Sequence, residues 1–80
     1  MAVLMVGSEE CRKCRQAKAV LKQRGLWPEL EYVAAGSDRG RELAVEHNQD
    51  MLPFYVLDDK AYTYTGEIMR ILEERREAGR

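Results

Sequence analysis

The residues of this 80-residue chain best suited to chemistry are two cysteines in the segment Cys11-Arg12-Lys13-Cys14. They follow an apolar run at 2–6 and precede a segment with helical character at 15–24. This placement puts them at the start of a helix, where free backbone N–H groups and the helix dipole favour an anion such as a thiolate. Because positions i and i+3 share one face of a helix, the two sulfurs can close into a disulfide and reopen. The spacing therefore predicts a dithiol exchange site.

The two cysteines are expected to have different roles. Exchange proceeds by attack of a thiolate on a disulfide, so the attacking sulfur needs access and a lowered pKa. Cys11, at the exposed end of the helix, is the predicted nucleophile, and Cys14, one turn further on, is predicted to release the product. The cations at 12, 13 and 15 favour the Cys11 thiolate, whereas the glutamates at 9 and 10 oppose it. We expect the pKa of Cys11 to lie below the value of about 8.5 for a free thiol.

Other uses of the cysteine pair would each need a different chemistry. A structural disulfide is disfavoured, because Cys11 to Cys14 closes almost the shortest loop available and disulfide stabilisation grows with loop length. A structural zinc site needs four ligands, and the chain offers two Cys and one His, His47. A soft-metal module that binds Cu(I) through paired thiolates, or an iron–sulfur binding module without turnover, stays open as the alternative.

Composition limits the class of protein. The chain is long enough for one small domain, expected to span residues 1–80, and its formal net charge is −1 with 34% charged residues of both signs. No basic patch of the kind that nucleic acid needs is evident, and no apolar run has the length of a membrane span. The first residues, Met1-Ala2-Val3, lack the basic region of a signal peptide. We expect a monomeric, cytoplasmic protein that binds neither nucleic acid nor membrane.

Hydrophobic patterning predicts seven elements in the order βαβαββα. Strands are expected at 2–6, 29–34, 51–57 and 61–64, and helices at 11–24, 38–47 and 66–78. Gly25 is typical of the residue just after a helix, and Ser37 is typical of an N-cap. The residues expected to face inward are Cys14, Ala17, Val20 and Leu21 in the first helix, Leu43, Ala44 and His47 in the second, and Ile68, Met69, Ile71 and Leu72 in the third.

This order, with a CxxC at the start of the first helix and Met51-Leu52-Pro53 before the third strand, resembles the glutaredoxin family, the minimal form of the thioredoxin fold. The resemblance covers essentially the whole chain. It implies an α/β fold with a four-stranded mixed sheet in the order 2-1-3-4, an antiparallel third strand and helices on both faces. It also implies a cis peptide bond before Pro53, which would turn the Leu52 backbone toward Cys11.

The resemblance further implies a thiol–disulfide oxidoreductase that reduces protein or small-molecule disulfides, with no bound metal or organic cofactor. The predicted catalytic residues are Cys11 and Cys14, and the predicted substrate-binding residues are Arg12, Lys13, Leu52, Pro53, Tyr64, Thr65 and Gly66. The chain departs from the family pattern at Arg12-Lys13, where Pro-Tyr is usual, and at 63–66, where Gly-Gly-x-Asp is usual. The resemblance still implies glutathione as a candidate co-substrate despite these departures, and either glutathione or thioredoxin reductase is a candidate reductant.

Overall fold

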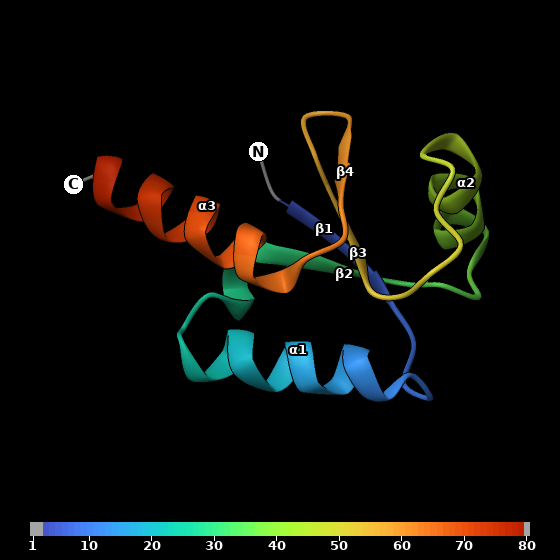
Figure 1. Cartoon of the computed structure of the whole chain (residues 1–80), viewed down its shortest axis with the longest axis horizontal. Helices are drawn as coiled ribbons and strands as arrows, with labels where there is room; N and C mark the ends of the chain where they lie inside the picture. Colours follow the sequence, from blue (N-terminus) through green and yellow to red (C-terminus); the bar gives the residue numbers. More distant parts are fainter. Residues whose placement is uncertain (1–2, 80) are drawn as a thin grey trace.

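Four strands form one sheet with helices on both of its faces in the computed structural model, which describes residues 3–79 (Figure 1). The strands are β1 (Val3–Gly7), β2 (Leu30–Ala34), β3 (Phe54–Leu57) and β4 (Lys60–Tyr62). Their order in the sheet is β2-β1-β3-β4. β2 is parallel to β1, whereas β3 is antiparallel to both β1 and β4. The predicted α/β, thioredoxin-like architecture and its strand order are confirmed.

The helices are α1 (Arg12–Gln23), α2 (Asp38–Glu46) and α3 (Thr65–Ala78), and a short 3-10 turn, η1 (Trp27–Glu29), precedes β2. α1 and α3 pack on one face of the sheet, and α2 packs on the other (Figure 1). None of the helices within residues 3–79 combines the length and the apolar composition needed to cross a membrane.

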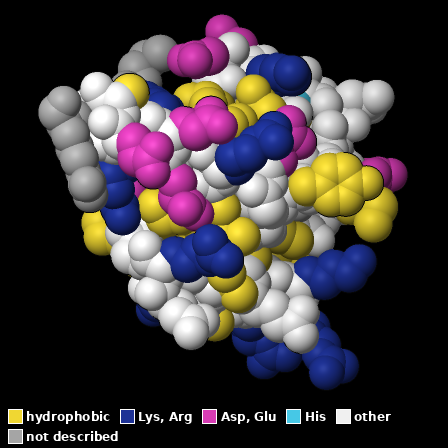
Figure 2. Space-filling view, turned by 60° about the vertical axis from the view of Figure 1, so that its left-hand side comes forward, with side chains coloured by type: hydrophobic (Ala, Val, Ile, Leu, Met, Phe, Trp, Pro, Cys, Tyr) yellow, Lys and Arg dark blue, Asp and Glu magenta, His cyan; other side chains and the backbone are white. Residues whose placement is uncertain are grey.

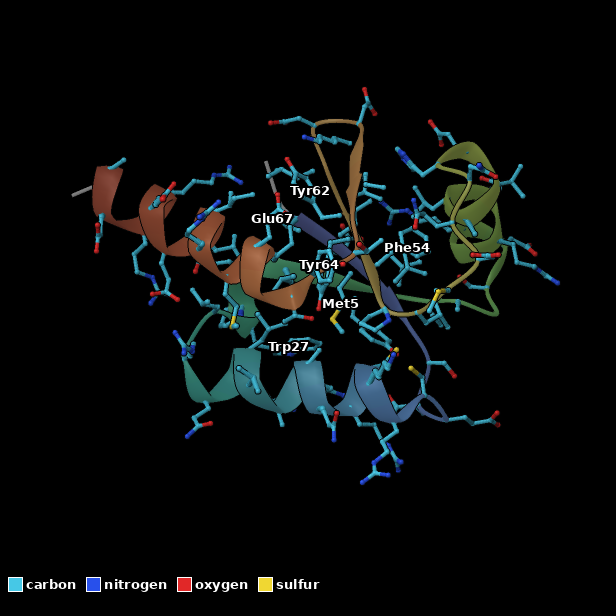
Figure 3. The ribbon with its side chains drawn as sticks, in the orientation of Figure 1. Met5, Trp27, Phe54, Tyr62, Tyr64 and Glu67 are labelled. Atoms are coloured by element: carbon cyan, nitrogen blue, oxygen red, sulfur yellow. The ribbon has the colours of Figure 1, made fainter. Side chains whose placement is uncertain are left out.

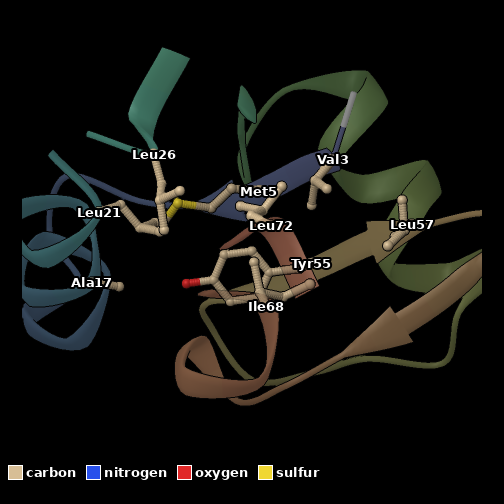
Figure 4. Packing of buried hydrophobic residues seen from close by; sticks show 9 residues of the cluster. All are labelled: Val3, Met5, Ala17, Leu21, Leu26, Tyr55, Leu57, Ile68 and Leu72. Atoms are coloured by element: carbon tan, nitrogen blue, oxygen red, sulfur yellow. The ribbon is translucent and has the colours of Figure 1, made fainter. Parts of the chain in front are cut away.

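The core lies on both faces of the central strand β1, because successive side chains of a strand point to opposite sides. The larger cluster lies beneath α1 and α3 (Figure 4), and its buried members are Val3, Met5, Ala17, Leu21, Leu26, Tyr55, Leu57, Ile68 and Leu72. The smaller cluster lies beneath α2, and its buried members are Val6, Val33, Phe54 and Val56. The inward-facing residues predicted for α2 and α3 pack against these clusters, apart from His47, which caps the C-terminal end of α2.

The end of α1 is closed as predicted at Gly25. Gly25 has a φ of +71°, and its N–H donates to the Lys22 carbonyl at 3.1 Å. The N–H of Leu26 donates to the Leu21 carbonyl at 2.9 Å, and the Leu26 side chain is fully buried. This pair of bonds is the Schellman motif with its hydrophobic contact. It turns the chain back toward the sheet and starts β2 beside β1.

Charged side chains of α3 form hydrogen bonds and ion pairs with this turn. Arg76 donates to the Gly25 carbonyl at 2.6 Å and to the Glu29 carboxylate at 2.8 Å, and Arg24 pairs with Glu73 at 3.2 Å. On the face of the molecule shown in Figure 2, Lys and Arg side chains alternate with Asp and Glu side chains, and hydrophobic side chains are visible between them. The interspersed charges agree with the composition.

α2 begins at a tight turn after β2. The Ser37 hydroxyl accepts the Gly40 N–H at 3.0 Å and donates to the Ala34 carbonyl at 2.6 Å, which confirms Ser37 as the N-cap. Gly40 lies so close to this turn that an added Cβ would sit 3.0 Å from both the Ala34 carbonyl carbon and the Ala35 Cα. Only a residue without a Cβ fits at this approach of helix to turn.

Two predictions in the first half of the chain were wrong in detail. Val20 is 36% exposed and does not face inward, because it lies about 90° around α1 from the mean direction of the three buried residues of that helix. The second strand begins at Leu30, since Trp27, Pro28 and Glu29 form a 3-10 turn with proline in its first turn. Ala2, expected in the first strand, lies outside the described residues, and β1 extends to Gly7.

The third and fourth strands are shorter than predicted. β3 begins at Phe54 and not at Met51, because Pro53 has no N–H to give to the sheet. The Leu52–Pro53 peptide bond is cis, as the resemblance implied. Asp58 and Asp59 have φ values of 51° and 63°, so a tight two-residue turn joins β3 to β4. β4 ends at Tyr62, and α3 begins at Thr65, one residue before the predicted start.

Candidate functional site

Cys11 lies between β1 and α1, at the N-cap position of the helix. Its Sγ accepts a hydrogen bond from the Cys14 N–H at 3.2 Å, so the sulfur satisfies one of the free amides of the first turn. The same Sγ lies 3.9 Å from the Leu52 carbonyl oxygen, on the segment before the cis proline. Cys11 is half-buried, and both cysteines are free thiols. The sulfur is therefore both anchored and accessible.

The surroundings of Cys11 favour its thiolate. Partial burial alone would raise the pKa of Cys11, but the hydrogen bonds from the Cys14 side chain and backbone and from the Lys13 amide outweigh it. The positive charge of Lys13 acts in the same direction. The net result is a pKa below the ordinary thiol value, which is the direction that the sequence predicted.

Cys14 has the opposite character. It is 2% exposed on the inner side of α1, and burial raises its pKa to about 11. Its hydrogen bond to Cys11 and the charge of Cys11 also raise the pKa, whereas the backbone of Ser8 lowers it. At neutral pH Cys14 is thus a protonated thiol in hydrogen-bonding range of Cys11.

Gly7, the last residue of β1, is a site residue that the sequence analysis did not single out. A Cβ at Gly7 would lie 3.2 Å from the Cys14 Sγ, 3.3 Å from the Cys14 Cβ and 3.4 Å from the Tyr32 Cε1. The two distances to Cys14 are tighter than ordinary van der Waals contact. The last residue of β1 therefore leaves the space that Cys14 occupies. The position of a glycine directly after an apolar strand and before a CxxC is the only signal that the sequence carries.

A groove of about 460 Å³ opens beside Leu52, whose carbonyl oxygen lies near the Cys11 Sγ, although Cys11 itself does not line the groove. It is lined by Lys13, Gln49, Asp50, Met51, Leu52, Pro53, Thr63, Tyr64 and Thr65. Met51 and Tyr64 are apolar side chains left largely exposed, at 65% and 74%, and Figure 3 shows Tyr64 next to the start of α3. The groove has a cation at Lys13 and an anion at Asp50.

The groove brings together most of the predicted substrate-binding residues, namely Lys13, Leu52, Pro53, Tyr64 and Thr65. Arg12 is exposed and does not line it, and Gly66 lines a separate hollow beside Glu67 and Arg70. Gln49, Asp50, Met51 and Thr63 are lining residues that the sequence analysis missed. These residues reach the groove because the chain between α2 and β3 turns at 49–53 and because β4 ends early, at Tyr62. The hydrophobic pattern of the sequence indicates neither feature.

A protein-family model, described as the glutathione S-transferase N-terminal domain, matches residues 5–80. The chain belongs to this family. The matched region includes both cysteines, the Leu52–Pro53 segment and the start of α3. The comparison confirms a thioredoxin-like family, which is a coarser statement than the glutaredoxin resemblance. A search of curated proteins found no match.

The thiols are the residues of this family member that could hold a soft metal, because thiolates are the ligands that Cu(I) prefers. Within residues 3–79, no group of three or more His, Cys, Asp or Glu side chains converges in a way that could hold a metal ion. His47 lies at the end of α2, on the other face of the sheet from α1.

Proposed function

We propose that this protein is a glutaredoxin-like thiol–disulfide oxidoreductase that reduces protein or small-molecule disulfides. The observation that carries the proposal is the contrast between its two sulfurs. Cys11 is accessible and has a lowered pKa, whereas Cys14 is buried and has a pKa of about 11. Exchange needs one sulfur that attacks as a thiolate and a second that stays protonated until the mixed disulfide has formed. Membership of a thioredoxin-like family supports a thiol-dependent activity.

The reaction follows from these roles. The Cys11 thiolate attacks one sulfur of the substrate disulfide, the substrate S–S bond breaks, and the other sulfur leaves as a thiolate. Cys14 then loses its proton to solvent and attacks the Cys11 sulfur, which forms the Cys11–Cys14 disulfide and releases the second substrate thiolate. The substrate gains two electrons, and the dithiol loses them. An external reductant restores the dithiol.

The groove supports binding of the substrate next to Cys11. The Leu52 carbonyl faces the attacking sulfur, and the exposed apolar surfaces of Met51 and Tyr64 are available to groups that flank a disulfide. Glutathione, which the family description names, is the proposed co-substrate. Lys13 and Asp50 offer opposite charges for its carboxylates and its ammonium group. A reducing compartment such as the cytoplasm suits a site that must return to the dithiol.

The test is turnover of bis(2-hydroxyethyl) disulfide, followed as NADPH consumption. Glutathione with glutathione reductase is compared with thioredoxin reductase alone, which identifies the reductant. We expect Cys11→Ser to abolish turnover with either reductant. Cys14→Ser is the matched control, because it keeps the nucleophile and is expected to retain only the glutathione-dependent reaction. Full activity of Cys11→Ser would contradict the proposal.

Two other results would favour different functions. Uptake of Cu(I) by the reduced protein without any disulfide turnover would favour the soft-metal module. Conjugation of glutathione to 1-chloro-2,4-dinitrobenzene without disulfide turnover would favour the transferase activity that the family description names.

A further inference from the structure

Tyr55 is the polar exception in the larger core cluster. Among the buried members of that cluster it alone carries a side-chain oxygen, and its exposure is 0%. Phenylalanine would fill nearly the same volume without burying a hydroxyl, and burying a hydroxyl has a cost unless it is hydrogen-bonded. Packing alone therefore does not account for a tyrosine at this position.

The Tyr55 hydroxyl is held at a defined place. It lies 2.7 Å from the Thr65 Oγ1, at the first residue of α3. Thr65 in turn lines the groove beside Leu52. Figure 4 shows the tyrosine ring reaching from β3 with its oxygen directed toward α1, where Ala17 is the labelled neighbour. Ala17 is one helical turn after Cys14.

The electrostatics agree with this geometry. Burial raises the pKa of Tyr55, the hydrogen bond with Thr65 lowers it, and the charge of Cys14 raises it. Cys14 and Ala17 are both buried on the inner face of α1, so the phenol oxygen is directed at the side of the helix that carries the Cys14 sulfur. The groups that act on the pKa of Cys14 are Cys11, the Ser8 backbone and the Cys14 backbone itself. On β2, burial and the charges of Glu9, Cys14 and Cys11 raise the pKa of Tyr32.

We propose that Tyr55 is a positioning residue for the second step of exchange, in which it and Thr65 direct a hydroxyl dipole at the charge that forms on buried Cys14. The inference rests on the proposed oxidoreductase function. A tyrosine and a threonine hydroxyl can each donate or accept, so the pair can reverse its polarity. While Cys14 is a neutral thiol, Tyr55 can donate to Thr65. When Cys14 becomes a thiolate, Thr65 can donate to the phenol oxygen and leave the phenol O–H free to turn toward α1.

The two steps can be separated with 5,5′-dithiobis(2-nitrobenzoate). Attack by the Cys11 thiolate releases one nitrothiobenzoate anion and leaves the other bound to Cys11 as a mixed disulfide. Attack by Cys14 then releases the second anion and one proton. Stopped-flow absorbance therefore gives a first phase for Cys11 and a second phase for Cys14.

In Tyr55→Phe, we expect the first phase to keep its rate and the second phase to slow by about tenfold, because a hydroxyl aimed at a charged group is lost. The pH midpoint of the second phase should move upward. Thr65→Val, which removes the hydroxyl partner, should also slow the second phase, and Thr65→Ser, which keeps that hydroxyl, should restore its rate. These Thr65 variants test the idea independently if Tyr55→Phe does not fold.

Tyr62→Phe is the matched control. Tyr62 lies directly opposite Tyr55 on β4 and is half-buried, so the substitution removes the same group from the neighbouring strand. We expect both phases to keep the wild-type rates in this variant. An unchanged second phase in Tyr55→Phe, or an equal slowing of both phases, would overturn the inference. Absence of the second phase in the unaltered protein would instead refute the proposed function.

Discussion

Replacement of Gly40 by alanine is expected to be among the most damaging small substitutions in this chain. The added Cβ would fall well inside van der Waals distance of the Ala34 carbonyl oxygen, and 3.0 Å from the Ala34 carbonyl carbon and the Ala35 Cα. All of these are backbone atoms, so no change of rotamer can relieve the contact. α2 would have to move away from the end of β2 by roughly 1 Å.

The expected cost follows from what that movement disturbs. Overpacking typically costs 1–3 kcal/mol, and a clash with backbone belongs at the upper end, so we expect a loss of about 3 kcal/mol. For a domain of this size, 1 kcal/mol corresponds to roughly 4–8 °C in Tm, which predicts a decrease of roughly 12–24 °C. The same movement would displace the segment 49–53, which follows α2 and lines the groove.

Thermal and urea denaturation followed by circular dichroism, with a reductant present, measure this loss. Gly36→Ala is the matched control, because a Cβ at Gly36 has nothing within 4 Å. We expect the control to change stability by less than about 0.5 kcal/mol. A loss below about 1 kcal/mol in Gly40→Ala, or equal losses in the two variants, would refute the steric reasoning.

Three further predictions concern the site and the helix ends. The rate at which iodoacetamide alkylates Cys11 should rise with pH and level off at a lower pH than for a free thiol, because the pKa of Cys11 is lowered. Cys14 should stay unmodified until the pH approaches its pKa of about 11, and peptide mass spectrometry measures the modification of each cysteine. Ser37→Ala should lower stability by about 1 kcal/mol in urea denaturation, because the N-cap is lost. Arg76→Ala should cost about 1 kcal/mol by the same assay, since a charged donor to the Gly25 carbonyl disappears from a half-exposed position.

The sequence contained the parts of this fold that depend on local signals. The apolar run before Cys11, the glycine after α1 and the serine before α2 each reflect interactions among neighbours in the chain, and each led to the right element. The resemblance added the strand order and the cis bond at Pro53, which local signals do not specify.

The rest depended on contacts between distant segments. Gly7 is important because Cys14 and Tyr32 crowd it, and Tyr55 because its hydroxyl meets Thr65 from another element. Neither relation leaves a periodic pattern in the sequence. The start of β3 was predicted too early for a different reason: the apolar run continues back to Met51, and the interruption of the strand by Pro53 was given too little weight.

The sulfur that reacts is also the atom that caps the helix. Whenever Cys11 is bonded to a substrate sulfur, its negative charge is gone and the Cys14 amide loses a charged acceptor. Cys11 stays uncharged in the Cys11–Cys14 disulfide that follows, and only reduction of that disulfide restores the charge at the positive end of α1. The first turn of α1 should therefore be most stable in the reduced protein, so each return to the dithiol also stabilises the start of the helix.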